Sequence, residues 1–275
     1  MRLIPPQYVK PFAKRAKNDR ADAEAICEAA ARTGIAFVPV KSAAQQAESL
    51  VLKVRETLVG QATLLVNTLR GHAAEFGVIA AGGSSQVAPL LVAIAEQTAI
   101  PPRAREMLVT LGEEIAHVDA RLKAIEAKLM AAHKANPVSS RLAVIAGVGP
   151  LTALTLATEI DPAAFKSGRH LAAWAGLTPQ EHSTGGKQRM GAISRAGNER
   201  LRQLLVLGAT SVIKVADKAD SRLATPWLSR LLQRKPRKLA AVALANKMAR
   251  IAWKIMASGE AYRHPVGGAG LVQVS

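Results

Sequence analysis

Two long stretches of helical periodicity constrain the fold of this chain more than any other feature. Apolar residues in the second stretch alternate spacings of three and four over three heptads, which is the pattern of a coiled-coil seam; they are Leu108, Leu111, Ile115, Val118, Leu122, Ile125 and Leu129. A similar repeat predicts a long helix over residues 42–76. We expect the two helices to pair as an antiparallel hairpin or to pair between chains. An ordinary amphipathic hairpin without a role in assembly is the alternative.

The rest of the chain also indicates a mainly α fold. Hydrophobic residues make up 49% of the sequence but aromatic residues only 3%, and Ala and Leu supply most of the remainder, as in packed helices. Residues 77–102 are expected to form a connector with one short helix. Residues 35–40 are expected to be a strand or extended. Further helices are predicted by the sequence pattern, and they cover residues 21–31, 141–175 with a glycine break, 198–216 and 236–257.

The charge is concentrated in the C-terminal half. The formal net charge is +17, and the stretch 183–254 contains sixteen Lys or Arg residues against three acidic residues. A solvated, solubilising face is the alternative interpretation, but solubility does not require so one-sided a cluster. Neutralising nucleic-acid phosphates does require many cations in one region. The sequence therefore predicts a nucleic-acid-binding protein.

Other bulk features indicate a soluble, cytoplasmic chain. The single cysteine, Cys27, cannot form an internal disulfide. No run of 18 apolar residues occurs, and the start of the sequence lacks the pattern of a signal peptide. We therefore expect no membrane partner.

The segment Gly147-Val148-Gly149-Pro150 is expected to be a tight turn between two helices. Glycine allows positive φ and close backbone approach, and proline suits the first helical turn. The N–H groups at such a helix start can hold a phosphate. The turn thus resembles a helix-hairpin-helix motif that grips DNA backbone, with Gly147, Gly149 and Thr152 as candidate contacts. A plain turn between helices is the alternative.

The loop over residues 176–187 carries a hydroxyl pair, Ser183 and Thr184, beside His182. Serine attacks a phosphate only when a base takes its proton and cations hold the developing charge. His182 is the candidate base. Lys187, Arg189 and Arg195 are the candidate clamp, although by spacing alone such a loop is usually only a loop.

Two further clusters are candidates for polyanion or metal chemistry. Asn198 starts a helix that carries Arg202 near its beginning, and cations there suggest an anionic partner, a solvated face being the alternative. Asp19 and Asp22 lie three residues apart on one helix face, where they could help to hold Mg²⁺. An N-cap and a favourable first-turn acid explain the same pair without a metal.

Taken together, these segments resemble the insertion-sequence transposases of the IS-one-ten type, the family that includes the Piv invertases. The resemblance rests on an ordered series of motifs and reaches to about residue 262. The series is Lys-Asn-Asp-Arg-Ala-Asp-Ala at 17–23, Gly-Val-Gly-Pro at 147–150, Ala-Gly-Leu-Thr-Pro at 175–179, Ser-Thr-Gly-Gly-Lys at 183–187, and Ile-Ser-Arg-Ala-Gly-Asn with Leu-Arg at 193–202.

The resemblance implies a domain order and a chemistry. Residues 1–40 would be the end of an α/β, RNase H-like resolvase domain with an Asp-Glu-Asp-Asp site for Mg²⁺, in which Asp19 and Asp22 match the last two carboxylates. Residues 41–136 would be a helical coiled coil that makes homo-oligomers. Residues 137–260 would be a DNA-binding serine transposase domain, and 261–275 a flexible tail. Ser183 would be the nucleophile that joins DNA, with Thr184 as the alternative.

The resemblance also implies nucleic-acid partners and an incomplete set of metal-binding carboxylates. Members of the family pair a structured bridge RNA with donor and target DNA, so DNA and a guide RNA are the expected partners. The first aspartate and the glutamate of the four-carboxylate site have no room upstream of Asp19. The reading frame is then truncated, its start was assigned too late, or the chain is a natural remnant, and we expect this polypeptide to be impaired in DNA cleavage by itself. A non-catalytic nucleic-acid-binding protein is the main alternative, and a metal nuclease of resolvase type is the weakest.

Overall fold

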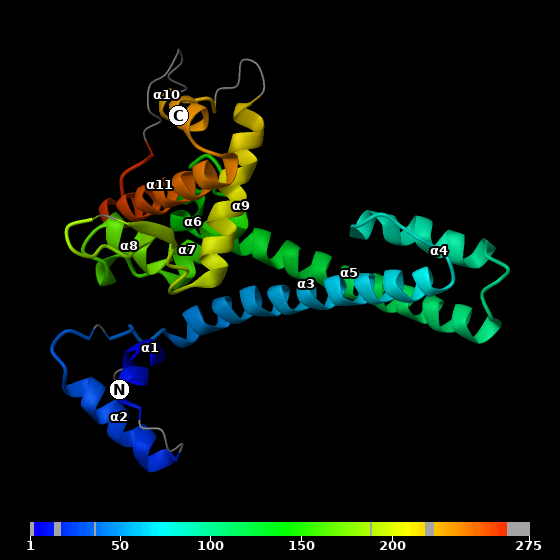
Figure 1. The fold of residues 1–275 in the computed structure, drawn as a ribbon, viewed down its shortest axis with the longest axis horizontal. Helices are drawn as coiled ribbons and strands as arrows, with labels where there is room; N and C mark the ends of the chain where they lie inside the picture. The colour runs from blue at the N-terminus through cyan, green and yellow to red at the C-terminus, as the bar shows by residue number, and fades with distance from the viewer. Residues whose placement is uncertain (1–2, 14–17, 36, 188, 218–222, 263–275) are drawn as a thin grey trace.

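The computed structural model describes residues 3–13, 18–35, 37–187, 189–217 and 223–262. Its described part is mainly helical, as the sequence predicts, and it also contains a single two-stranded sheet. Figure 1 shows a long helical hairpin that projects from a helical C-terminal unit, which spans residues 137–262. A small N-terminal helical pair lies at the base of the hairpin. None of the helices in the described ranges is long and apolar enough to cross a membrane.

The N-terminal pair is built from short helices. Helix α1 (Pro6–Val9) runs into a 3₁₀ turn, η1 (Lys10–Phe12), and both pack against α2 (Asp19–Ala31). Asn18 caps α2, because its side chain accepts a hydrogen bond from the backbone N–H of Ala21. Among the described residues of the segment 35–40, Val38 forms an isolated antiparallel bridge with Leu3. The described part of residues 1–40 thus contains no named strand, and a resolvase-like origin stays a prediction.

The prediction that the two periodic stretches form long helices is confirmed, and the two helices form a hairpin. Helix α3 (Ala43–Glu75) and α5 (Pro102–Ala135) run antiparallel within one chain, and a capping box at Ser42 and Gln45 starts α3. At the far end, η2 (Ser84–Gln86) leads into α4 (Val87–Glu96), whose buried side chains join those of both long helices in one apolar cluster. Pairing between chains through this hairpin stays a prediction.

The C-terminal unit packs six helices around its own core. They are α6 (Pro137–Leu142), α7 (Pro150–Glu159), α8 (Gly168–Trp174), α9 (Glu199–Ala216), α10 (Pro226–Arg234) and α11 (Arg237–Ser258). A 3₁₀ turn, η3 (Pro162–Ala164), precedes α8, and the strands β1 (Pro179–Glu181) and β2 (Met190–Ile193) precede α9. The sequence did not predict α10, β1 or β2. The glycine break in residues 141–175 is confirmed as the turn between α6 and α7.

Helix α7 joins the hairpin to the C-terminal unit. It carries no charged side chain before Glu159, and nearly every residue from Thr152 to Thr158 is buried. On one side Leu154 packs with Leu52 of α3 and Leu129 of α5. On the other side Ala153 and Leu156 belong to the core of the C-terminal unit. Because α7 packs into the core of the C-terminal unit and also against both long helices, it fixes the base of the hairpin.

Two glycine backbones touch where the α6–α7 turn crosses α9. A Cβ placed on Gly208 would lie 1.9 Å from the carbonyl oxygen of Gly147, and Gly147 itself has a φ of +86°. Met248 of α11 closes the same contact. Only residues without a side chain allow the turn and the helix to approach so closely.

This crossing predicts opposite effects for the same substitution in two helices. Gly208→Ala should destabilise the C-terminal unit by about 2 kcal/mol or more, because the new methyl group overpacks a backbone contact. Gly60→Ala in α3 is the matched control: nothing lies within 4 Å of its Cβ position, so the better helix propensity of alanine should stabilise by up to about 1 kcal/mol. Thermal unfolding followed by circular dichroism measures both. Equal midpoints for the two variants would contradict the crossing.

Candidate functional site

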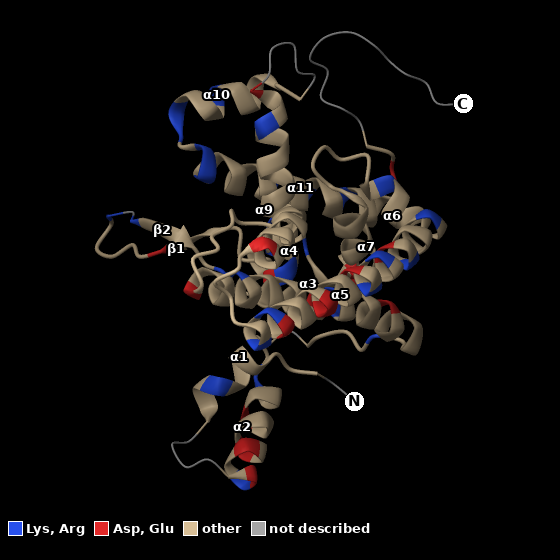
Figure 2. Ribbon diagram, turned by 90° about the vertical axis from the view of Figure 1, so that its right-hand side faces the viewer, with Lys and Arg blue, Asp and Glu red and all other residues tan. Residues whose placement is uncertain are grey.

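The candidate nucleophile lies on a two-stranded ribbon, residues 178–194, that projects from the C-terminal unit at the left of Figure 2. The ribbon continues past β1 and β2 to a tip at which Thr184 bridges Lys187. Gly185 and Gly186 form the tip with φ values of +58° and +78°. Two successive positive φ angles are the geometry of a tight hairpin turn whose twist matches that of its strands. The glycine-rich segment expected as a loop is therefore a β-hairpin.

Ser183 lies on the first arm of the ribbon and is half-buried. Its Oγ accepts a hydrogen bond of 3.2 Å from the backbone N–H of Arg189 on the second arm. This contact uses a lone pair of the oxygen and leaves the hydroxyl proton available to a base. A fixed N–H donor also stabilises negative charge that develops on the oxygen. Thr184, by contrast, is exposed next to the tip.

His182 neighbours Ser183 in sequence, but the structure gives it another contact. A Cβ on Gly191 would lie 2.9 Å from Cδ2 and Nε2 of the imidazole, so the ring rests against the bare backbone of the opposite strand. No hydrogen bond between His182 and Ser183 is present among the described residues. A general base needs hydrogen-bond reach, which can tighten when substrate binds. The role of His182 stays a prediction.

Three of the expected cations surround the ribbon with exposed side chains. Lys187 and Arg189 lie on its second arm, and Arg195 lies at its base with a φ of +53°. A non-glycine residue in this region of φ is uncommon. Here it belongs to the turn that leads the chain from β2 into α9. The ribbon thus carries the half-buried Ser183 together with exposed cations on its second arm and at its base.

The base of the ribbon is a second backbone crossing. A Cβ on Gly176 would lie 2.5 Å from the carbonyl oxygen of Ala196, and one on Gly197 would lie 1.8 Å from the carbonyl oxygen of Trp174. Both glycines also have positive φ. The segment that enters the ribbon therefore touches the segment that leaves it, backbone against backbone.

Arg202 ties this crossing together from below. Its guanidinium Nη1 donates to the carbonyl oxygens of Ala175 and Ala196 at 3.1 Å and 2.9 Å. The residue is only 8% exposed. A buried guanidinium that satisfies two backbone acceptors is a structural group. This role explains Arg202 better than the expected contact with a DNA phosphate.

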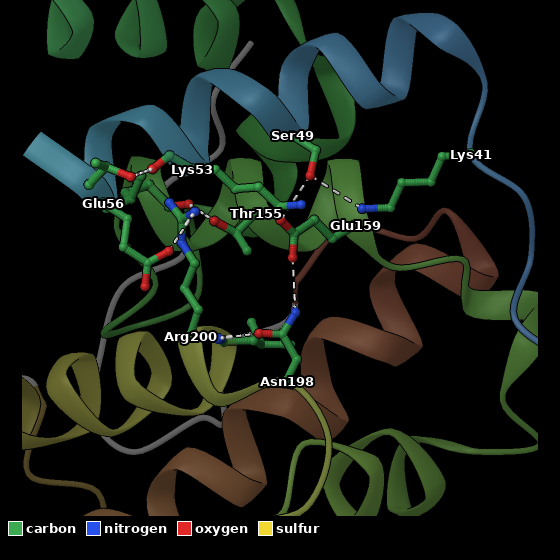
Figure 3. A network of polar contacts seen from close by, with 11 residues as sticks. Lys41, Ser49, Lys53, Glu56, Thr155, Glu159, Asn198 and Arg200 are labelled. Carbon is green, nitrogen blue, oxygen red and sulfur yellow. Dashed lines mark hydrogen bonds and ion pairs between the residues drawn. The ribbon is translucent and has the colours of Figure 1, made fainter. Parts of the chain in front are cut away.

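Asn198 caps α9 and joins a polar network at the base of the hairpin (Figure 3). Its Oδ1 accepts from the N–H of Leu201, while its Nδ2 donates to Glu159 at 2.9 Å. The other oxygen of Glu159 accepts from the buried Ser49 of α3 at 3.4 Å, and Lys41 donates to Ser49 at 3.3 Å. The cap of α9 is thereby linked to the hairpin.

An ion pair lies beside this network. Arg200 of α9 faces Glu56 of α3 at 3.5 Å, with a geometry too loose for a hydrogen bond. Neither Glu159 nor Arg200 was a candidate from the sequence, because their partners lie far away along the chain. The capping position of Asn198 was the only local signal for this junction.

The Gly-Val-Gly-Pro turn divides into a buried and an exposed part. Gly147 and Val148 belong to the core contacts. Gly149 and Pro150 are exposed at the start of α7, whereas Thr152 is buried. Close packing explains Gly147, and the exposed N-terminal end of α7 leaves phosphate contact at Gly149 as a prediction.

Asp19 and Asp22 lie apart from the ribbon. Both carboxylates are exposed on α2, which packs chiefly against α1 and η1 on the far side of α3 from the C-terminal unit (Figures 1 and 2). Within the described ranges, no group of three or more His, Cys, Asp or Glu side chains could hold a metal. The pair alone does not make a closed metal site. Lys17 of the same motif lies outside the described residues.

Comparison with known proteins places the chain in a class. The model of the IS116/IS110/IS902 transposase family matches residues 139–224, a range that begins within α6 and includes α7, α8, the ribbon and α9. The class defined by this domain is that of insertion-sequence transposases.

Similarity over nearly the whole chain supports the same class. The Sinorhizobium fredii protein y4pF/y4sB is 50% identical over 98% of this chain and 70% of its own length. The transposase for IS1111A from Coxiella burnetii is 40% identical over 95% of this chain and 72% of its own length. The transposase for IS1328 from Yersinia enterocolitica is 36% identical over 95% of this chain and 78% of its own length. The chain belongs to the IS116/IS110/IS902 family of transposases.

Substitution of Arg202 and of Arg195, the two arginines near the base of the ribbon, should distinguish a structural side chain from an exposed one. Arg202→Ala should destabilise the C-terminal unit by about 2 kcal/mol, because two carbonyls lose a charged donor. It should also speed amide hydrogen exchange throughout the ribbon. Arg195→Ala should change stability by less than about 0.5 kcal/mol, as exposed substitutions usually do. Similar exchange rates in the two variants would argue against the structural role of Arg202.

Because Asn198 contacts Glu159, the substitution Asn198→Asp should make the free energy of unfolding depend on pH. Asn198→Asp keeps the cap but places a second carboxylate against Glu159, which raises the pKa of the pair above ordinary values. A folded-state pKa above the unfolded value favours the native state at low pH, so the variant should lose about 1–2 kcal/mol at neutral pH and regain it on acidification. Asn198→Ser keeps a cap without the charge and is the control. Parallel pH profiles of urea unfolding for both variants would rule out the contact.

Proposed function

We propose that this chain attacks a DNA phosphodiester with Ser183 during transposition of an insertion sequence. The observation that carries the proposal is the placement of Ser183 on a projecting ribbon among exposed cations, with its Oγ held by a backbone N–H. In this proposal Ser183 forms a phosphoserine bond to one DNA end, and the 3′ or 5′ oxygen leaves with a proton. Thr184 is exposed nearby and is the alternative nucleophile.

DNA contact is assigned to the exposed part of the site. Lys187, Arg189 and Arg195 would hold phosphates at the ribbon, since exposed cations supply most of the affinity for a DNA backbone. Gly149 would add backbone N–H contact at the start of α7. Arg202 and Asn198 act beneath the ribbon, where they fix its base and the start of α9.

Mg²⁺ is assigned to Asp19 and Asp22. Mg²⁺ commonly binds through one or two carboxylates together with waters and substrate phosphates, so the exposed pair suits it only when DNA completes the coordination. Because the described part of the chain supplies no third acid there, we propose that DNA cleavage by this polypeptide alone is impaired. When bound, the ion would supply charge neutralisation at the phosphate.

A second copy and a guide RNA complete the proposed assembly. Helix α3 of the hairpin exposes the apolar side chain of Leu64 at 66%, and α4 at its far end exposes that of Val92 at 57%. Exposed apolar surface of this kind supports pairing between chains through the hairpin. The family resemblance and the strong positive charge support a structured RNA as a further partner.

Trapping a covalent adduct tests the serine mechanism. Purified chain in excess over end-labelled transposon-end DNA should give a low yield of protein–DNA adduct that survives denaturing electrophoresis. Ser183→Ala should abolish the adduct and Thr184→Val should keep it, because only the first removes the nucleophile. Asp19→Asn with Asp22→Asn should lower the yield further without weakening DNA binding.

The opposite results have distinct meanings. Saturating DNA binding without any adduct would leave a non-catalytic nucleic-acid-binding protein. An adduct lost in Thr184→Val but kept in Ser183→Ala would move the nucleophile to Thr184. Robust cleavage by this polypeptide alone would contradict the proposed impairment.

A further inference from the structure

A groove on the C-terminal unit lies away from the ribbon. Its volume is about 800 Å³, and it is bounded by the start of α8, by α10, by α11 and by residues 260–262. Helix α8 separates the two places, since it begins at the groove with Gly168 and ends with Trp174 at the crossing beneath the ribbon. The motifs that indicate the transposase family do not include the residues of this groove on α10 and α11.

Cations dominate the charge of the groove. Arg169, Lys247, Arg250 and Lys254 line it, against the single acid Glu260. The three cations of α11 are spaced by three and four residues, so they share one helix face. Arg169, Arg250 and Lys254 are exposed and therefore accessible to a ligand.

Lys247 shows how closely these cations are crowded. Burial and, second, the neighbouring Arg250 lower the pKa of its ammonium group. Both causes penalise the charged form, and a bound anion would relieve the repulsion. The ammonium also lies 4.2 Å from the centre of the Trp227 ring, a cation–π distance that fixes both side chains.

Aromatic side chains gather at the same place, although the chain is poor in them. Two of its three Trp residues, Trp227 and Trp253, and one of its two Tyr residues line the groove. The indole N–H of Trp253 donates to the carbonyl of Pro162, which anchors that ring to the body of the unit. Trp227 is half-buried at the edge between the groove and a second hollow lined by Arg230 and Arg234.

Size and charge together select the occupant. A hollow of this volume suits a drug-sized ligand, which corresponds to one or a few nucleotides and not to a double helix. The sequence of residues 263–275 contains no acidic residue, so charge complementarity favours a polyanion over the chain's own C-terminal segment. Cationic grooves with stacking aromatics are typical of single-stranded nucleic-acid binding.

We propose that this groove binds an unpaired segment of nucleic acid, with phosphates on Arg169, Arg250 and Lys254 and a base against Trp227. The inference deepens the proposed function, because it gives the transposase a contact for single strands that is separate from the Ser183 ribbon. DNA and RNA share the chemistry that the groove recognises.

The test uses the full chain carrying Ser183→Ala, so that failure of the serine mechanism cannot affect it. Fluorescence anisotropy would follow binding of labelled ten-nucleotide dT, the same length of rU, and a duplex of that length. Arg250→Ala with Lys254→Ala should weaken single-strand binding by about tenfold and reduce the slope of log affinity against log salt by roughly 1.4, since each phosphate contact contributes about 0.7. Arg121→Ala with Lys128→Ala, both exposed on α5, is the matched charge control and should leave single-strand affinity within about twofold.

A second variant tests the aromatic contact. Trp227→Leu should weaken binding by about tenfold, and Trp227→Phe should restore most of the affinity, which a purely structural role would not require. Unchanged thermal midpoints would show that the variants fold.

Two results would overturn the proposal. One is single-strand affinity that is the same in the groove variants and the hairpin control. The other is an equal loss of duplex binding, which would show a general basic surface. Equal weakening of dT and rU would leave both as ligands, whereas weakening of one alone would identify the source.

Discussion

The architecture around the candidate nucleophile depends on one buried guanidinium. Arg202 donates to carbonyl oxygens on both sides of the Gly176–Gly197 crossing, and this contact holds together two segments that enter and leave the ribbon. Few of the ribbon's side chains are buried, so apolar packing contributes little to its position. Its orientation must then come from its base, where glycine backbones and one charged donor allow little variation.

This arrangement separates the residues that position the candidate site from those that we propose to contact DNA. Arg202, Asn198 and Glu159 lie beneath the ribbon and satisfy one another or the backbone. Ser183, Lys187 and Arg189 lie on the ribbon itself, where Ser183 is half-buried and the two cations are exposed. Electrostatic catalysis benefits from such a division, because groups fixed in advance need no reorganisation when charge develops on the reacting oxygen.

The sequence predicts those parts of the fold that depend on local chemistry. Period and capping give the bounds of α2, α3, α9 and α11 to within two residues, the seam residues 108–129 all lie within α5, and proline marks the start of α7. The ribbon was missed because both of its faces are exposed and its strands show no alternation. The burial of Arg202 against two backbone carbonyl oxygens was not foreseen, because sequence alone does not separate a buried arginine from an exposed one. The hydrogen bond from Asn198 to Glu159 joins residues that are 39 positions apart, and no pattern in the sequence predicts such a contact.

Because the hairpin is long, small movements at the polar network of Ser49, Glu159 and Asn198 at its base become large at its far end. Helix α3 has 33 residues, and at 1.5 Å per residue it is roughly 50 Å long. A rotation of about 5° at Ser49 and Glu159 would therefore sweep α4 through roughly 4 Å, a distance comparable with the spacing of neighbouring base pairs. A small change in the hydrogen bonds at the base of the hairpin would therefore move its far end by several ångströms. Conversely, a ligand bound at the far end would act on the contacts beside Asn198, the cap of α9.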